Sequence, residues 1–215
     1  MRRALIVWGG WDGHRPREMA AGVEALLCDR GYDVVVTPDL AVLGGPDIEN
    51  VDLVVPLVTN AVIDTPVIRR LVAAVRGGTG LGGPHLAATA FRSAVDYHFM
   101  LGAQWVAHPG GIVDFRVDVT RPDDPIMRGI ASFPYRSEQY YLHYDPSIEV
   151  LATTTFSGAH DPVVAGITMP VVFKRRFGAG RVFYSALGHS PEELEHPQAR
   201  TILERGLLWA TRQAR

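Results

Sequence analysis

Three histidines each follow glycine-containing turns at the ends of short apolar segments. His14 closes the run Gly9-Gly10-Trp11-Asp12-Gly13-His14, His85 follows Gly82-Gly83-Pro84, and His189 follows Leu187-Gly188. Glycine permits tight turns and a close approach of backbone to ligand, so each histidine would be held in a constrained loop. Neutral imidazoles bind divalent metals and transfer protons near neutral pH. If the three loops meet, they predict a metal site or an acid–base site.

Glu138 could join these histidines. It lies in the segment Ser137-Glu138-Gln139-Tyr140-Tyr141. A carboxylate beside neutral imidazoles can complete a metal site or act as a general base, and a solvated loop acid is the alternative interpretation. We therefore expect His85, His189 and Glu138 to be catalytic. We expect His14, His85 and His189 to ligate a divalent metal, zinc or manganese.

Aromatic side chains accompany two of these motifs. Trp11, Tyr140 and Tyr141 could form a stacking face for a sugar ring, with Asp12 as a further substrate-binding group, or they could be core aromatics. The other histidines are expected to be hydrogen-bonded structural residues: His98, His108, His143, His160 and His196.

The elements that position these residues alternate between strand and helix patterns in the first part of the chain. Short apolar runs predict strands at residues 3–8, 32–37, 52–58 and 79–82, and helical spacing predicts helices at 16–30 and 65–76. This order is typical of βαβ units and indicates an α/β fold with a mainly parallel sheet. Ligands bind such sheets beyond the carboxyl ends of the strands, where the loops of His14 and His85 begin.

The second part of the chain is less regular. Residues 85–103 are weakly helical, 112–120 alternate as a half-exposed strand does, and 121–147 are expected to form a long ordered loop. Further strands are predicted at 149–155, 171–177 and 182–186, with a hairpin turn over 177–181. A helix is predicted over 197–212.

Composition narrows the class of protein. The chain has 215 residues, 47% of them hydrophobic, and a net charge of -2, which suits a single domain over residues 1–215. The near-neutral charge and the lack of a Lys/Arg run disfavour nucleic-acid binding. No stretch approaches the roughly 20 apolar residues that span a bilayer, and no signal-type segment opens the chain. We expect a cytoplasmic protein that does not bind membranes; its apolar content would allow a homo-oligomer.

Two features of the sequence that could indicate other functions do not support them. The run Gly78-Thr79-Gly80-Leu81-Gly82-Gly83 matches the letters of a dinucleotide-binding loop, but it follows a helix and no acid lies about twenty residues further on. We therefore expect no nucleotide cofactor. Cys28 is the one cysteine; it falls within the first predicted helix, where a buried structural thiol is expected.

Taken together, four segments resemble the ThuA-like family, which is named for trehalose utilisation. They are the loop Gly9–His14, the turn Gly80–His85, the element Ser137–Tyr140, and the hairpin Phe177–Tyr184 running into Leu187-Gly188-His189-Ser190. Arg205-Gly206-Leu207-Leu208-Trp209-Ala210 also fits the last helix of that family. The resemblance spans nearly the whole chain in the right order.

The resemblance implies a flavodoxin-like three-layer sandwich similar to the class I glutamine amidotransferases. In that comparison the Gly82–His85 turn falls near the nucleophile elbow, and His189 with Glu192 and Glu193 falls near the catalytic His and Glu. The elbow carries no cysteine, so glutamine amidotransferase activity is not expected. The family is associated with disaccharide use, including 3-keto-sugars.

Two functions follow from these observations. The first is an enzyme that acts on a sugar or 3-keto-sugar through a His/Glu site, with or without a divalent metal. The second is a non-catalytic sugar-binding or regulatory module on an amidotransferase-like scaffold, since a fold does not fix a function. Both predict a small sugar as the ligand.

Overall fold

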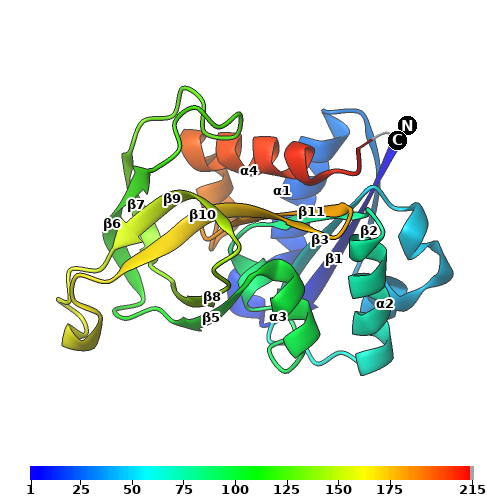
Figure 1. Ribbon diagram of the computed structural model, residues 1–215, viewed down its shortest axis with the longest axis horizontal. Helices are drawn as coiled ribbons and strands as arrows, with labels where there is room; N and C mark the ends of the chain where they lie inside the picture. The colour runs from blue at the N-terminus through cyan, green and yellow to red at the C-terminus, as the bar shows by residue number, and fades with distance from the viewer. Residues whose placement is uncertain (214–215) are drawn as a thin grey trace.

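A mixed β-sheet organises the computed structural model, which describes residues 1–213 (Figure 1). Within that range the sheet has nine strands in the order β2-β1-β3-β4-β11-β10-β9-β6-β7. The first five in this order run parallel and the rest antiparallel. The parallel strands are β2 (Tyr32–Thr37), β1 (Arg2–Gly10), β3 (Leu53–Thr59), β4 (Gly80–Gly83) and β11 (Gly180–Ser185).

The parallel part confirms the predicted α/β class. Its order, β2-β1-β3-β4 followed by one later strand, is the flavodoxin-like order 2-1-3-4-5. β3 is buried along its whole length, because strands covered on both faces of a parallel sheet are apolar throughout. The carboxyl ends of these strands share one edge of the sheet, which is where the predicted histidine loops begin.

Helices cover both faces of this parallel part. α1 and α4 lie over one face, with α2 and α3 on the other (Figure 1). Their bounds are α1 (Pro16–Cys28), α2 (Thr65–Arg76), α3 (Val95–Leu101) and α4 (Pro197–Ala210). α4 packs closely because glycine faces it: a Cβ at Gly80 would lie 2.2 Å from the carbonyl oxygen of Ala210. The glycine-rich run that mimics a dinucleotide motif is therefore a strand against which a helix packs.

The antiparallel part corrects the prediction for residues 121–147. Two strands lie within that segment, at residues 133–138 and 141–144. A further strand lies before it, at residues 103–107, where no strand was predicted. Phe133 and Tyr135 point inward and alternate with exposed Pro134 and Arg136, which is a strand pattern that the proline obscured. The antiparallel strands are β6 (Ile112–Val119), β7 (Phe133–Glu138), β9 (Glu149–Thr155) and β10 (Thr168–Phe177), with a separate pair, β5 (Ala103–Ala107) and β8 (Tyr141–Tyr144).

A buried ion pair ties the segment before β7 to the sheet. Lys174 on β10, the one lysine of the sequence, pairs with Asp124, and both side chains are less than a tenth exposed. Its Nζ also lies 5.1 Å from the ring centroid of Trp209 on α4. This contact links β10, the loop before β7 and the last helix.

Cys28 is exposed, so the prediction of a buried thiol is wrong. The buried face of α1 carries Met19, Val23, Leu26 and Leu27, and the helical turn places residue 28 off that stripe. α1 also ends two residues before the predicted limit. Among residues 1–213, no helix combines the length and apolar character needed to cross a membrane.

Candidate metal centre

The three predicted histidines meet at the carboxyl edge of the parallel strands. His14 follows β1, His85 follows β4 and His189 follows β11, and Glu138 reaches the same point from the end of β7. One potential ligand atom from each of the four lies within 4.8 Å of the others. The sequence predicts that the three histidines meet because each follows the end of a strand, and the structure brings them together.

The loop that carries His14 requires a glycine. Gly10 has a φ of +86°, and a Cβ there would lie 1.8 Å from the carbonyl oxygen of Thr59. That oxygen accepts a hydrogen bond from the Trp11 N–H (3.1 Å), so β1 and β3 stay in register as the chain turns. The short 3₁₀ turn Asp12–His14 then directs His14 inward, where its side chain is buried.

His85 is completely buried, and its hydrogen bonds fix its tautomer. Its Nδ1 lies 2.8 Å from the carbonyl oxygen of Ala186, which can only accept, so Nδ1 carries the proton. Burial is the largest effect on this ring and lowers the pKa of His85, although the neighbouring Glu138 opposes it. The other ring nitrogen, Nε2, lies 3.1 Å from an oxygen of Glu138. With Nδ1 bonded to Ala186, Nε2 is the atom that could ligate a cation held beside Glu138.

His14 presents a second free ring nitrogen to the same point. Its Nδ1 and the Thr59 hydroxyl are 2.7 Å apart, whereas its Nε2 is buried and has no hydrogen-bond partner among residues 1–213. Burial and the neighbouring His85 and His189 lower the pKa of His14 to about 3, so this ring is neutral at ordinary pH. A buried polar atom without a partner costs free energy, and a bound cation would remove that cost.

His189 and Glu138 also contact each other in the cluster. The His189 Nδ1 lies 3.4 Å from a Glu138 oxygen. Burial opposes charge on both groups, but their hydrogen bonding prevails: the pKa of His189 is raised and the pKa of Glu138 is lowered. Glu193 holds the main chain here, since its carboxylate accepts hydrogen bonds from the His189 N–H (3.0 Å) and the Tyr135 hydroxyl (2.9 Å).

The residues fit a divalent metal by the chemistry of their donors. Three imidazoles and one carboxylate form a donor set that zinc accepts in proteins. Metal-binding histidines commonly use the second ring nitrogen in a hydrogen bond that orients the ring, as His14 does with Thr59 and His85 with Ala186. The cluster thus has both ligands and the groups that orient two of them.

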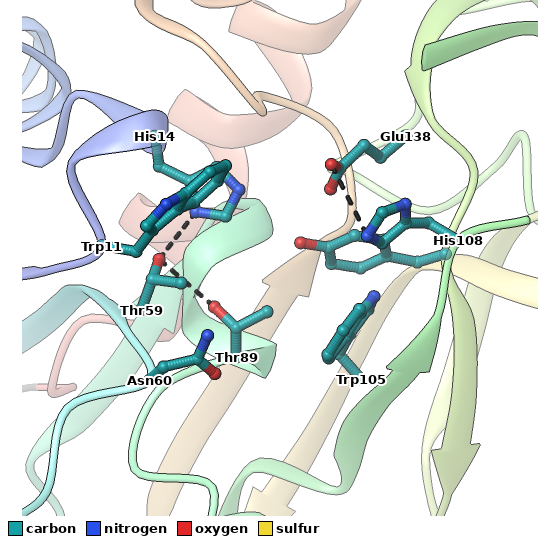
Figure 2. A pocket seen from close by; sticks show the side chains of 9 residues that line it. Trp11, His14, Thr59, Asn60, Thr89, Trp105, His108 and Glu138 are labelled. Atoms are coloured by element: carbon teal, nitrogen blue, oxygen red, sulfur yellow. Dashed lines mark hydrogen bonds and ion pairs between the residues drawn. The ribbon is translucent and has the colours of Figure 1, made fainter. Parts of the chain in front are cut away.

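A cavity of 370 Å³ opens beside the cluster (Figure 2). Its wall includes Trp11, His14, Thr59, Asn60, Thr89, Trp105, His108, Glu138 and Tyr140. Two of the predicted substrate-binding residues, Trp11 and Tyr140, lie there. The other two are elsewhere: Asp12 is exposed at the start of its 3₁₀ turn, and Tyr141 packs against Phe156 with ring centroids 6.0 Å apart.

Tyr140 is both a core aromatic and a residue of the cavity wall, the two roles considered for it. It is a buried aromatic, and its ring centroid lies 3.9 Å from that of His85 while it also lines the cavity. Burial raises its pKa well above the ordinary value, so it presents a neutral phenol.

His108 was predicted to be an ordinary structural residue, yet it lines the cavity, and its Nε2 lies 3.7 Å from a Glu138 oxygen. It follows β5, which pairs with β8, a strand more than thirty residues further along the chain. Asn60 and Trp105 were also missed. The signal for Asn60 was its place directly after β3, beside the strand ends that carry the histidines.

A flavodoxin-like sheet with a histidine–carboxylate cluster at its carboxyl edge defines an α/β protein whose site is formed by the loops at its strand ends. Comparison with family models then identifies the chain as a member of the ThuA family (trehalose utilisation), which matches residues 3–210. No curated protein matches the sequence.

Solved structures share this fold at low sequence identity. A ThuA-like protein from Parabacteroides merdae superposes with a TM-score of 0.78 at 17% identity, covering 100% of this chain and 92% of that one. A protein described as cytoplasmic from Salmonella typhimurium gives 0.65 at 14% identity, covering 99% and 100%. The glutaminase domain of a CTPS from Trypanosoma brucei gives 0.52 at 10% identity, covering 95% and 94%, which agrees with the class I amidotransferase-like fold.

Proposed function

We propose that this ThuA-family protein is an enzyme that acts on a sugar or 3-keto-sugar and holds a divalent metal, zinc or manganese, on His14, His85, His189 and Glu138. The observation that carries the proposal is the convergence of the four residues, each of which offers one ligand atom within 4.8 Å of the others. The family's association with trehalose utilisation supports a sugar as the substrate.

When bound, such a metal polarises a carbonyl or lowers the pKa of a coordinated water. The chain's own residues bind and orient the substrate beside it. Trp11 offers an exposed aromatic face at the cavity rim, and the neutral Tyr140 packs against the His85 ring. Glu138 has one oxygen directed to His85 within the cluster and the other toward His108 at the cavity wall, where it can accept a hydrogen bond from a sugar hydroxyl.

The deciding experiment is elemental analysis of untagged, dialysed protein expressed with trace zinc, manganese and iron. We expect about one equivalent of metal in the wild type and its loss in His85→Ala and in the less buried His189→Ala. His143→Ala, which removes an exposed histidine outside the cluster, should keep the metal. Circular dichroism would verify that each variant is folded. A metal-free wild type, or a folded His85→Ala that retains metal, would refute the proposed centre.

Turnover of sugars and keto-sugars tests the enzymatic part separately. Loss of turnover in His85→Ala and His189→Ala is expected. Metal and sugar binding without turnover of any sugar tested would instead support the non-catalytic sugar-binding module.

A further inference from the structure

Asn60 has an unusual backbone conformation at the cavity wall. It directly follows β3 and has a φ of +56°, in the left-handed region that few residues other than glycine adopt. Its N–H donates to the carbonyl oxygen of Thr89 (3.1 Å), which fixes the turn. Asparagine tolerates this region better than most residues, although it still costs free energy relative to glycine.

The side chain of Asn60 is free. Asparagine in turns commonly hydrogen-bonds nearby backbone, which offsets the cost of the conformation. Here the residue is exposed, and its amide makes no hydrogen bond to any group within residues 1–213. Figure 2 shows it beside Thr59 and Thr89, across the open space from Trp105. Its donor and acceptor therefore remain available to a molecule in the cavity.

Trp11 offers an aromatic face at the same cavity. The residue is 54% exposed, and its ring lies close to Gly13, where a Cβ would lie 2.2 Å from the ring. The ring also packs against His14 in a T-shaped arrangement, with centroids 4.9 Å apart. These contacts position an indole that remains exposed, as stacking on a flat ligand face requires.

Arginine and lysine are absent from the part of the cavity wall that the structure describes, and its basic side chains are His14 and His108. The nearby Arg92 packs over the Trp105 ring, with its Cζ 4.6 Å from the centroid, and does not line the cavity. Phosphate recognition normally uses arginine or lysine. The cavity volume, 370 Å³, is at the lower end of the range for ligand pockets and suits one ring.

We propose that Asn60 is a ligand-recognition residue whose amide hydrogen-bonds a hydroxyl of a neutral sugar ring stacked on Trp11, and that the pocket selects unphosphorylated sugars over their phosphate esters. This inference rests on the proposed function, because the metal cluster forms the adjoining wall. An amide both donates and accepts, as a hydroxyl does, and this makes the pair complementary.

The variant Asn60→Gly distinguishes a ligand-recognition role of Asn60 from a structural role. Glycine adopts a positive φ freely, so the variant keeps the turn and removes only the amide. Calorimetric titration of metal-loaded protein would compare D-glucose, trehalose and trehalose 6-phosphate. In the wild type we expect a neutral sugar to bind at least tenfold more tightly than the phosphate ester. In Asn60→Gly we expect about tenfold weaker sugar binding, with unchanged metal content and melting temperature. Asn60→Asp, similar in shape, should widen the discrimination against the phosphate.

Three outcomes would overturn the inference: sugar binding by Asn60→Gly equal to the wild type, equal or tighter binding of the phosphate ester, or no binding of either neutral sugar. A variant that loses metal or melts earlier would also overturn it, because that result assigns Asn60 a structural role. The metal centre is judged by elemental analysis alone, so a wild type with metal but no sugar affinity refutes only the recognition proposal.

Discussion

At the scale of single residues, two of the metal-facing imidazoles are oriented by hydrogen bonds on their far sides. The Ala186 carbonyl fixes the His85 tautomer, and the Thr59 hydroxyl bonds to the His14 Nδ1. Both partners are buried; Thr59 is the last residue of β3 and Ala186 directly follows β11, so the sheet sets the ring positions. Loss of an outer contact of this kind typically lowers metal affinity about 10- to 100-fold.

Thr59→Val tests this directly. Valine matches the shape of threonine but leaves the buried His14 Nδ1 without a partner, so we expect metal affinity to fall about 10- to 100-fold with the fold intact. Competition with a fluorescent zinc chelator would measure the change. Thr59→Ser retains the hydroxyl and should stay near the wild-type value. Equal affinity in all three proteins would show that this hydrogen bond does not orient the ligand.

His98 gives a pH-dependent stability that is separate from the metal centre. It is buried, and its Nδ1 donates to the Ala103 carbonyl oxygen (3.1 Å). Burial lowers the pKa of His98 in the folded state below 6.5. As the pH falls below about 6.5, the histidine is therefore protonated in the unfolded chain before it is protonated in the folded chain. The free energy of unfolding therefore decreases toward acid, by at most about 1.4 kcal/mol per pH unit from this group.

The matched variant is His98→Asn, which can still donate to the carbonyl but cannot titrate. Denaturant unfolding at pH 7.5 and 5.5 would give the loss of stability in each protein. We expect a smaller loss in His98→Asn than in the wild type, whatever the difference at pH 7.5. The same loss in both would mean that His98 protonates equally in the folded and unfolded states.

The site residues that sequence reasoning found are those whose own neighbours identify them. His14, His85 and His189 each stand in a local glycine motif after an apolar run. His108 and Asn60 have no such motif. His108 reaches the cavity through the pairing of β5 with β8, which residue types do not reveal. Asn60 lies just beyond a predicted strand, but the backbone angle that distinguishes it cannot be read from residue types.

At the scale of elements, the same contrast separates strands with a local sequence signal from strands without one. β1 and β3 could be predicted because each contains a buried apolar run that is followed by an amphipathic helix. The strands β5, β7 and β8 could not, since they pair with distant segments and carry mixed residues, with Pro134 within β7. Their stability comes from cross-strand contacts, which local propensity does not report.

Two helix glycines test how tightly the elements pack. Gly22 in α1 and Gly206 in α4 would gain the same helix propensity on replacement by alanine, about 1 kcal/mol. A Cβ at Gly206 would lie 2.1 Å from the ring of the fully buried Phe183, whereas one at Gly22 would lie 3.2 Å from a methyl of Leu194. We expect Gly206→Ala to lose about 1–3 kcal/mol and Gly22→Ala to be neutral or stabilising in denaturant unfolding. Equal effects would show that α4 can move away from the sheet.

At the scale of the whole molecule, the cluster joins segments that are distant in the chain. His14, His85 and His189 follow β1, β4 and β11, and Glu138 is the last residue of β7, so a bound metal would tie both parts of the sheet together. An unfolded chain does not hold the four ligands at one point. Metal binding should therefore contribute directly to the stability of the fold.

Metal removal tests this coupling. At a free metal concentration one hundred times its dissociation constant, binding to the folded state adds about 2.7 kcal/mol to the free energy of unfolding. We expect a chelator to lower the melting temperature of the wild type and to leave His85→Ala unchanged. Scanning calorimetry with and without the chelator measures both. An equal shift in the variant would place the stabilising ion elsewhere.

The buried pair of Lys174 and Asp124 also affects chemical modification of the protein. Because the sequence contains one lysine and its ammonium is enclosed by Asp124 and Trp209, acylating reagents meet no exposed side-chain amine in the folded chain. Lysine acylation would then proceed only as fast as β10 separates from the segment before β7. The rate of that reaction, followed by mass spectrometry, would measure the rate of local opening in the antiparallel part of the sheet.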